Sequence, residues 1–176
     1  MSKSNFLYSL VGLLVMLGLG ACAPFMVQSP QIQKDTLIEG PALAQFEPKA
    51  DLSPEQVVKI QVEALQNNDD MDRGIEITFK FASPANKQLT GPLYRFKQLV
   101  KNPLYRPMLN HKLAEYAPIQ VSGDVATQRV TIIERNGQAT VYLFSLSKQN
   151  TPGCEGCWMT DSVSVVPTRK QDLEGI

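Results

Sequence analysis

Two cysteines separated by two residues, Cys154 and Cys157 in the stretch TPGCEGCWMTD, are the first candidates for chemistry in this 176-residue chain. Such a pair forms a disulfide, works as a redox dithiol or supplies half of a zinc site, and its surroundings decide between these roles. A structural zinc site needs four ligands and a catalytic site needs three. Besides these two thiols the chain offers a single histidine, His111, so we expect no metal site within one chain.

The surroundings of the cysteine pair disfavour redox catalysis. A redox dithiol lies at the exposed start of a helix, where the helix dipole lowers the pKa of the attacking thiol. Here Gly153 and Gly156 accompany the cysteines, and the residues that follow read as a strand. In an oxidising compartment we therefore expect a disulfide between Cys154 and Cys157 that clips the turn before the last strand. A redox pair and two free thiols are the alternatives.

Few residues are suited to acid–base catalysis. A general acid or base must be a titratable group placed against the substrate, and the candidates are His111, Asp161, Tyr105 and Tyr94. Trp158 offers an apolar wall, but strand alternation puts it on the opposite face from Asp161 unless a bulge intervenes. The sequence has no phosphate-binding glycine loop, nucleophile elbow or paired zinc motif. We therefore assign no catalytic residue and expect no cofactor.

Polar and aromatic side chains gather around the proline-bounded segment NPLYRPMLNH, residues 102–111. Pro103 and Pro107 prevent this segment from continuing a helix, so we expect a long structured loop. Its polar side chains are expected to fix the loop by hydrogen bonds, and the alternative is contact with a ligand or partner. The residues of this candidate pocket or partner surface are Tyr94, Tyr105, Arg106, Asn110 and Trp158.

The N-terminus indicates export. The apolar run from Phe6 to Leu19 is too short for a comfortable membrane span and is placed where a signal peptide belongs. It ends in Leu-Gly-Ala-Cys, which resembles the lipobox of bacterial lipoproteins. The resemblance implies cleavage after residue 21 and a diacylglycerol thioether on Cys22, which anchors the domain to a membrane and places it in the periplasm or in a thylakoid lumen. An uncleaved anchor helix and an ordinary secretory signal are the alternatives.

Composition divides the chain into four parts. A signal peptide (1–21) precedes a proline-containing tether (22–51), which spans roughly 30 Å as a flexible chain. A single domain (52–167) and a polar tail (168–176) follow, and the alternative for the tether is that its apolar residues pack along the domain. Basic residues form no run longer than two and the formal net charge is zero, which excludes the electrostatic footprint of nucleic-acid binding.

Helical patterns fill the first half of the domain. In LSPEQVVKIQVEALQNNDD, Ser53 and Gln56 are spaced as a capping box around Pro54, and the helix ends in the polar cluster 67–72. We interpret this cluster as helix capping, with Asp70 or Asp72 starting the next helix, and binding of a cation by its carboxylates is the alternative. The stretch ASP at 82–84 breaks the second helix into a turn, and a third helix begins at Pro92.

The second half has the period of strands. HKLAEYAPIQV reads as an edge or bulged strand because of Pro118, and two further strands flank Asn136-Gly137, the preferred pair for a two-residue hairpin turn. CWMTDSVSVV supplies the last strand. Helices first and hairpin-connected strands after predict an α+β domain, with N-terminal helices packed on an antiparallel sheet of about four strands.

This order of elements resembles the nuclear transport factor two-like, or cystatin-like, superfamily, in which a curved sheet wraps around helices to form a cone. A closer resemblance, to the domain of unknown function 4864 family, rests on LSPEQVVKIQVEALQNNDD, FKFASPANKQLTGPLYRFKQLVKNPLYRPMLNH and CWMTDSVSVV. The superfamily resemblance implies a pocket at the open end of the cone and raises a homodimer formed through the sheet.

These features favour a non-enzymatic accessory or binding module, held at a membrane by the lipid on Cys22. The module is expected to dock on a membrane-associated partner or to hold a small apolar ligand in its cone. The alternative is a small pocket enzyme, with isomerase-like or hydrolase-like acid–base chemistry on His111 or Asp161.

Overall fold

A computed structural model describes residues 46–167. The expected signal peptide with Cys22, the tether up to residue 45 and the polar tail 168–176 lie outside the described residues. The described part contains a helical half followed by a strand half, and the predicted α+β class is confirmed.

Four α-helices and one short 3-10 turn make up the helical half. They are α1 (Pro54–Gln66), α2 (Arg73–Lys80), α3 (Pro84–Thr90), α4 (Leu93–Val100) and the 3-10 turn η2 (Arg106–Met108). The predicted capping box of α1 is confirmed, because the Ser53 hydroxyl accepts a hydrogen bond from the Gln56 amide and the Gln56 side chain accepts one from the Ser53 amide. Local sequence therefore suffices to start α1.

Helix α2 starts at a predicted residue, but the side chain that caps it is a different one. Asp72 occupies the N-cap position with a left-handed φ of 62°, but its side chain accepts no hydrogen bond from the helix. Asp69 does this instead, accepting from the backbone amides of Met71 and Arg73 at 3.1 and 3.0 Å. The carboxylate of Asp72 is paired with the ammonium of Lys101, which explains why it is turned away from the helix start.

Two further helix starts were misplaced. The stretch predicted to break into a turn begins α3, where Ser83 is the N-cap and its hydroxyl accepts from the Asn86 amide at 3.2 Å. Pro92 is the N-cap of α4 rather than its first helical residue.

The sheet has five antiparallel strands. They are β1 (Leu113–Tyr116), β2 (Gln120–Ser122), β3 (Val125–Ile133), β4 (Ala139–Thr151) and β5 (Cys154–Val166). Their order is β1-β3-β4-β5, and β2 pairs with β3 on the same side as β1. The one strand predicted around Pro118 is therefore two short strands, because proline has no amide hydrogen for the sheet.

The hairpin between β3 and β4 is confirmed, but its loop is longer than predicted. Ile133 pairs with Ala139, and the Glu134 amide donates to the Gln138 carbonyl at 2.9 Å. This leaves a loop of three residues that ends in Gly137 at a φ of 85°. A three-residue loop of this kind places its last residue in the left-handed region, which glycine adopts without strain.

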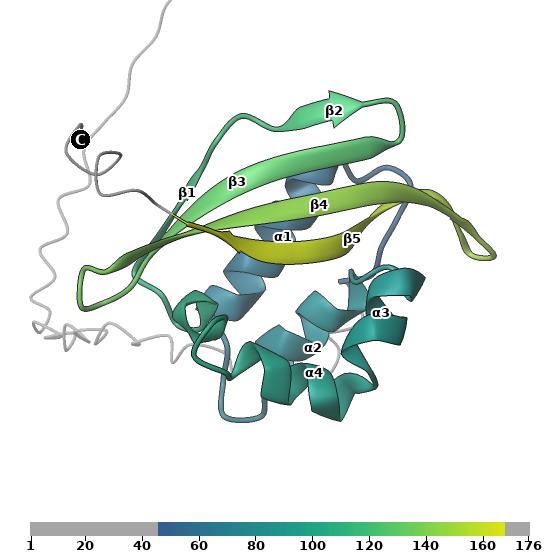
Figure 1. The fold of residues 1–176 in the computed structure, drawn as a ribbon. Coiled ribbons are helices and arrows are strands. Elements are labelled where there is room, and N and C mark those ends of the chain that lie inside the picture. The colour runs from purple at the N-terminus through teal and green to yellow at the C-terminus, as the bar shows by residue number, and fades with distance from the viewer. Residues whose placement is uncertain (1–45, 168–176) are drawn as a thin grey trace, which may run out of the picture. The chain divides into compact units, whose positions relative to one another are not determined.

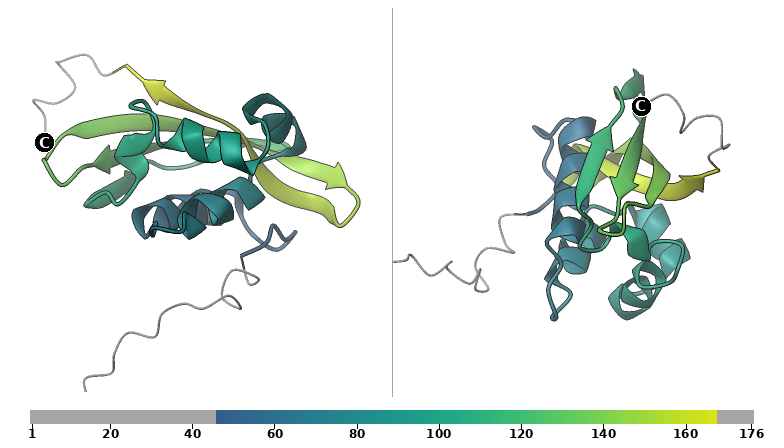
Figure 2. Two further views of the ribbon diagram at one scale, coloured as in Figure 1. Left: turned by 90° about the horizontal axis from the view of Figure 1, so that it is seen from below. Right: turned by 90° about the vertical axis from the view of Figure 1, so that its left-hand side faces the viewer.

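The helices and the sheet enclose one core. Figure 1 shows the sheet curving over α1, while α2, α3 and α4 lie together on the side of β5, and Figure 2 gives two further views. The core contains Val57, Val62, Ile75, Phe81, Val130, Tyr142, Phe144 and Trp158. Phe46 and Leu52 pack against it, and Glu47 forms an ion pair with Lys80. The last residues before α1 thus lie on the domain.

Thr160 of β5 joins the two halves. Its hydroxyl donates to the Gln61 side-chain oxygen at 2.6 Å, and the Gln61 amide nitrogen donates to the Thr78 carbonyl at 3.1 Å. The backbone amide of Thr160 donates to the Phe81 carbonyl at 2.8 Å, and the Thr160 carbonyl accepts from the Ser83 amide at 2.9 Å. All five residues are nearly inaccessible to solvent, so each of these hydrogen bonds replaces one to water.

We expect Thr160→Val to lower the free energy of unfolding by about 1–3 kcal/mol, because it leaves the Gln61 oxygen buried without a partner. Urea denaturation followed by circular dichroism measures the change. Thr131→Val on β3, which is only half-buried, is the matched control and should change the stability by less than about 0.5 kcal/mol. Equal effects of the two variants would contradict the role assigned to Thr160.

Candidate functional site

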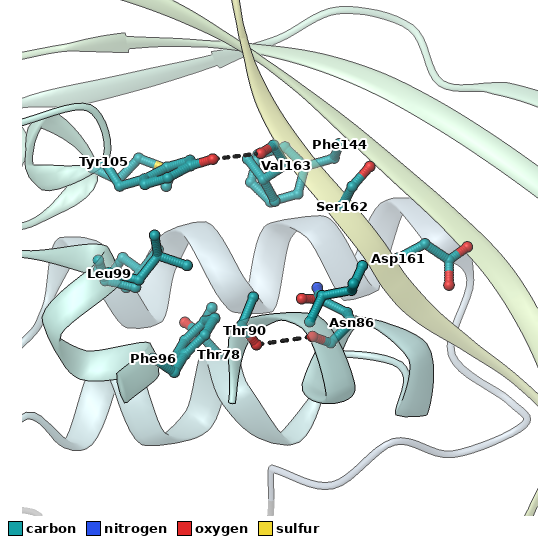
Figure 3. A pocket seen from close by; sticks show the side chains of 14 residues that line it. Thr78, Asn86, Thr90, Phe96, Leu99, Tyr105, Phe144, Asp161, Ser162 and Val163 are labelled. Carbon is teal, nitrogen blue, oxygen red and sulfur yellow. Dashed lines mark hydrogen bonds between the residues drawn. The ribbon is translucent and has the colours of Figure 1, made fainter. Parts of the chain in front are cut away.

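A largely apolar cavity of about 200 Å³ lies between β5 and the helices α3 and α4 (Figure 3). The helices contribute Phe96, Leu99 and Val100 from α4 and Asn86, Leu89 and Thr90 from α3. Asp161, Ser162 and Val163 of β5, with Phe144 of β4, form the opposite wall, and Tyr105 and Met108 close one end. The cavity is thus built by residues far apart in the sequence.

The cavity opens where the outer edge of β5, the edge away from β4, loses its partner. The segment just before α3 runs parallel to β5 and forms a bridge between Ala82 and Thr160. Ser83 then caps α3, and the chain leaves the strand. The free edge of β5 beyond Thr160 consequently faces the cavity instead of another strand.

A bulge in β5 sets the direction of Asp161. Ser145 of β4 pairs with Ser162 and Leu146 pairs with Thr160, so Asp161 has no partner on β4. A bulged residue leaves the regular alternation, and its side chain is re-aimed. Asp161 therefore lines the cavity, while Trp158 packs in the core outside it with Lys148 over its ring.

Tyr105 forms a fixed wall of the cavity. Its hydroxyl donates to the Val163 carbonyl at 3.1 Å, and its ring stacks on that of Tyr142 with 6.4 Å between the ring centres. The Tyr142 hydroxyl in turn donates to the Leu104 carbonyl at 2.8 Å, and burial raises the pKa of Tyr142. Both tyrosines hold the loop 102–111 against the sheet, as predicted for Tyr105.

His111 lies in a different hollow, beside Glu134 and Arg135. It is 3% exposed, and its Nδ1 lies 2.8 Å from the Met108 carbonyl, which makes Nδ1 the protonated nitrogen. Its Nε2 is buried and has no hydrogen-bond partner within residues 46–167. Burial lowers the pKa of His111, and the hydrogen bond to Met108 opposes this shift. The structure thus does not bring His111 and Asp161 together as an acid–base pair.

Asn110 closes the C-terminal end of α1. Its backbone, at a φ of 51°, donates to the Leu65 carbonyl at 3.0 Å. Oriented to satisfy both of its polar atoms, the side-chain amide donates to the carbonyls of Gln66 and Asn68 at 3.1 and 2.9 Å. These bonds satisfy carbonyl groups that a helix end leaves unpaired, so Asn110 holds the loop in place.

The other predicted surface residues lie apart from the cavity. Arg106 borders an open hollow beside the hairpin of β3 and β4. Tyr94 is 60% exposed, and the side chain of Arg95 donates to its hydroxyl at 3.1 Å. Of the five predicted pocket residues, the structure brings only Tyr105 into the cavity.

The polar cluster 67–72 is tied up in contacts within the domain. Asp69 pairs with Arg73, and Asp72 pairs with Lys101, whose hydrogen bond holds the pKa of that carboxyl below its usual range. Within the described part of the chain, no three histidine, cysteine, aspartate or glutamate side chains gather as metal ligands. The capping interpretation holds for Asp69, whereas the side chain of Asp72 is held by its ion pair.

Cys154 and Cys157 form the predicted disulfide, with 5.2 Å between their Cα atoms. Its position differs from the prediction, because both cysteines belong to β5 rather than to a turn before it. Asn150 pairs with Glu155 and Gln149 pairs with Cys157, so the intervening Gly156 is the extra residue of a second bulge. The disulfide spans this bulge, and Gly156 adopts a φ of 77° there.

The family model described as domain of unknown function (DUF4864) matches residues 48–173, which include every helix and strand described above. The chain belongs to the DUF4864 family. A search of curated proteins and a search of solved structures gave no significant match. In residues 46–167 of this DUF4864 chain, no helix has the length and apolarity needed to cross a membrane.

The residues that sequence reasoning missed are mainly those of α3 and α4. Asn86, Thr90 and Leu99 have ordinary helical spacing and are not residue types that suggest catalysis. Their pattern therefore does not show whether they line a cavity or pack in a filled core. One signal was present, since Ser83-Pro84 is a typical helix start. This signal predicts a further helix that begins after residue 83.

The chain's single histidine gives a clean pH prediction. Because the folded-state pKa of His111 is below the unfolded value of about 6.5, its contribution to stability is complete above that pH. We expect the free energy of unfolding to fall as the pH decreases from there toward the folded-state pKa, by at most about 1.4 kcal/mol per pH unit. In His111→Asn, which keeps a donor for Met108, this dependence should disappear; identical pH profiles would contradict the assignment.

Proposed function

We propose that this DUF4864 domain is a binding module that holds a small apolar ligand in the cavity beside β5, and that a lipid on Cys22 tethers it to a membrane. The observation that carries the proposal is the cavity itself. It is lined mainly by apolar side chains and contains no catalytic constellation. Pockets with these properties are the usual sites of small-molecule binding.

The size of the cavity limits the ligand. A volume of about 200 Å³ is below the usual range of drug-sized sites and somewhat above the 150 Å³ known to hold benzene in an engineered cavity. The ligand therefore resembles a single ring with a short chain, or a short alkyl chain. Phe96, Phe144 and Tyr105 offer aromatic faces to such a molecule.

The cavity supports binding better than catalysis. Asp161 and Tyr105 are its titratable residues, and the hydroxyl of Tyr105 is already bonded to a backbone carbonyl. His111, the other residue considered for an enzyme, has its unprotonated nitrogen buried in a different hollow. An enzyme in this cavity would have to rely on Asp161 alone, so the enzymatic alternative has less support.

The membrane tether has independent support in the sequence. The apolar run from Phe6 to Leu19 and the four residues ending in Cys22 have the form of a lipoprotein signal. The disulfide between Cys154 and Cys157 suits an oxidising compartment such as the periplasm or a thylakoid lumen. A domain tethered there would deliver its ligand to, or receive it from, a membrane-associated partner.

Ligand binding is tested on the mature chain, residues 22–176 with Cys22→Ser, which contains the whole core. We expect propylbenzene, a ring with a short chain, to bind saturably, as measured by NMR chemical-shift changes at cavity residues. Leu99→Phe should weaken binding at least tenfold, because it fills the cavity. Leu113→Phe, the matched control on the exposed edge strand β1, should leave binding unchanged. Absence of saturable binding to the unsubstituted cavity would refute the proposal.

The tether and the disulfide are tested together by the intact mass of the protein purified from its native membrane. We expect the mass of residues 22–176 with acyl chains added. Alkylation should modify two thiols only after reduction, because Cys154 and Cys157 are bonded and Cys22 carries the lipid. An unlipidated full-length chain that is alkylated without reduction would contradict the proposed compartment.

A further inference from the structure

We infer that the ligand of this cavity carries a protonated amine, held at the cavity mouth by Asp161, with its apolar body between α4 and β4. This inference rests on the proposed function, since it names the chemical class of the molecule that the same cavity takes. It is carried by the hydrogen-bonding capacity and charge left over at one end of the cavity.

Apart from the hydroxyl of Ser162, which can donate or accept, the polar side-chain atoms at this end that remain available are acceptors. The Asn86 amide nitrogen donates to the Thr160 carbonyl at 3.0 Å, and no group of residues 46–167 donates to the Asn86 side-chain oxygen, which therefore remains able to accept a hydrogen bond. The Thr90 hydroxyl gives its proton to the Asn86 carbonyl at 2.9 Å and keeps only lone pairs. The carboxylate of Asp161 can only accept. A ligand group that matches these three residues must donate.

The charge at the mouth is negative and uncompensated. Asp161 is the one lining residue with a carboxylate or a cationic side chain. Among residues 46–167, the ion pairs are formed by other carboxylates, and Asp161 forms none. A cationic group supplied by the ligand is therefore the complement that this end of the cavity lacks.

The carboxylate of Asp161 lies where it can pair with an ammonium group that remains partly exposed to water. Figure 3 shows Asp161 and Asn86 at the same end of the cavity, with the Asp161 carboxylate turned outward. Asp161 is half-buried, so a cation beside it keeps part of its hydration. Full burial of both charges would cost more than their attraction returns. The apolar body of the ligand then extends toward Leu99, Phe144 and Tyr105.

The bulge gives Asp161 this position. In a regular strand Asp161 would share the outer face with its alternate neighbours, whereas the shift between the pairs of Ser145 and Leu146 frees it from β4. The competing explanation is that Asp161 is a charge that protects the free edge of β5 from pairing with another chain. The two explanations differ in what Asp161→Asn does to ligand affinity.

The experiment compares three probes of similar shape: phenethylamine, which is cationic at neutral pH; propylbenzene, which is neutral; and 3-phenylpropionate, which is anionic. Affinities are measured by NMR titration of the mature chain with Cys22→Ser. We expect Asp161→Asn to weaken phenethylamine binding roughly fivefold, as for a partly exposed ion pair, and to leave propylbenzene binding unchanged. Binding of 3-phenylpropionate should not weaken.

The matched control is Asp124→Asn, which removes the same charge from an exposed carboxylate outside the cavity and should leave all three affinities unchanged. If propylbenzene binds but Asp161→Asn alters no affinity, or alters all three equally, the amine inference is overturned while the cavity proposal stands. If Asp161→Asn instead only increases self-association, Asp161 protects the strand edge and the inference is likewise overturned. Failure of every probe to bind overturns the cavity proposal itself.

Discussion

The hydrogen bonds around Thr160 are the constraint on which the rest of this domain depends. One residue of β5 binds Gln61 of α1 through its hydroxyl and the segment before α3 through its backbone. Its carbonyl also accepts from Asn86 of α3. Buried polar groups are costly unless they are all paired, so the separation between the helices and the sheet has little freedom at this point. Apolar burial drives the two halves together, and this network fixes their register.

The cavity follows from the same constraint. The parallel bridge at Thr160 holds the chain against β5 for a few residues only, and Ser83 then turns it into α3. The bulge at Asp161 begins in the next residue of β5, so the strand and the helix diverge from one place. Packing the helices closer would break the bonds of Thr160, and opening them further would expose the core. A space between α3, α4 and β5 is the outcome that satisfies both.

Features set by neighbouring residues could be predicted from the sequence, and features set by distant ones could not. The capping box of α1 and the hairpin at Gly137 each depend on a few adjacent residues, and both are found where predicted. The length of that hairpin loop depends on the register with β4, which the dipeptide alone does not encode. The cavity depends on three elements meeting, and the bulge that aims Asp161 is visible only in the pairing with β4.

Residue type is a poor guide to the site in this domain, for a physical reason. Histidine, tyrosine and asparagine attract attention because they can do chemistry, yet a small domain needs the same groups to pair its own buried carbonyls. His111, Tyr105 and Asn110 each bond to a backbone carbonyl of the domain. The side chains that form the cavity are ordinary apolar residues, whose unusual property is the space they leave. Because the cavity is open to solvent, its apolar walls stay in contact with water, and covering them would contribute roughly 25 cal/mol per Å² of apolar surface. A molecule that bound only the folded domain there would therefore stabilise the fold.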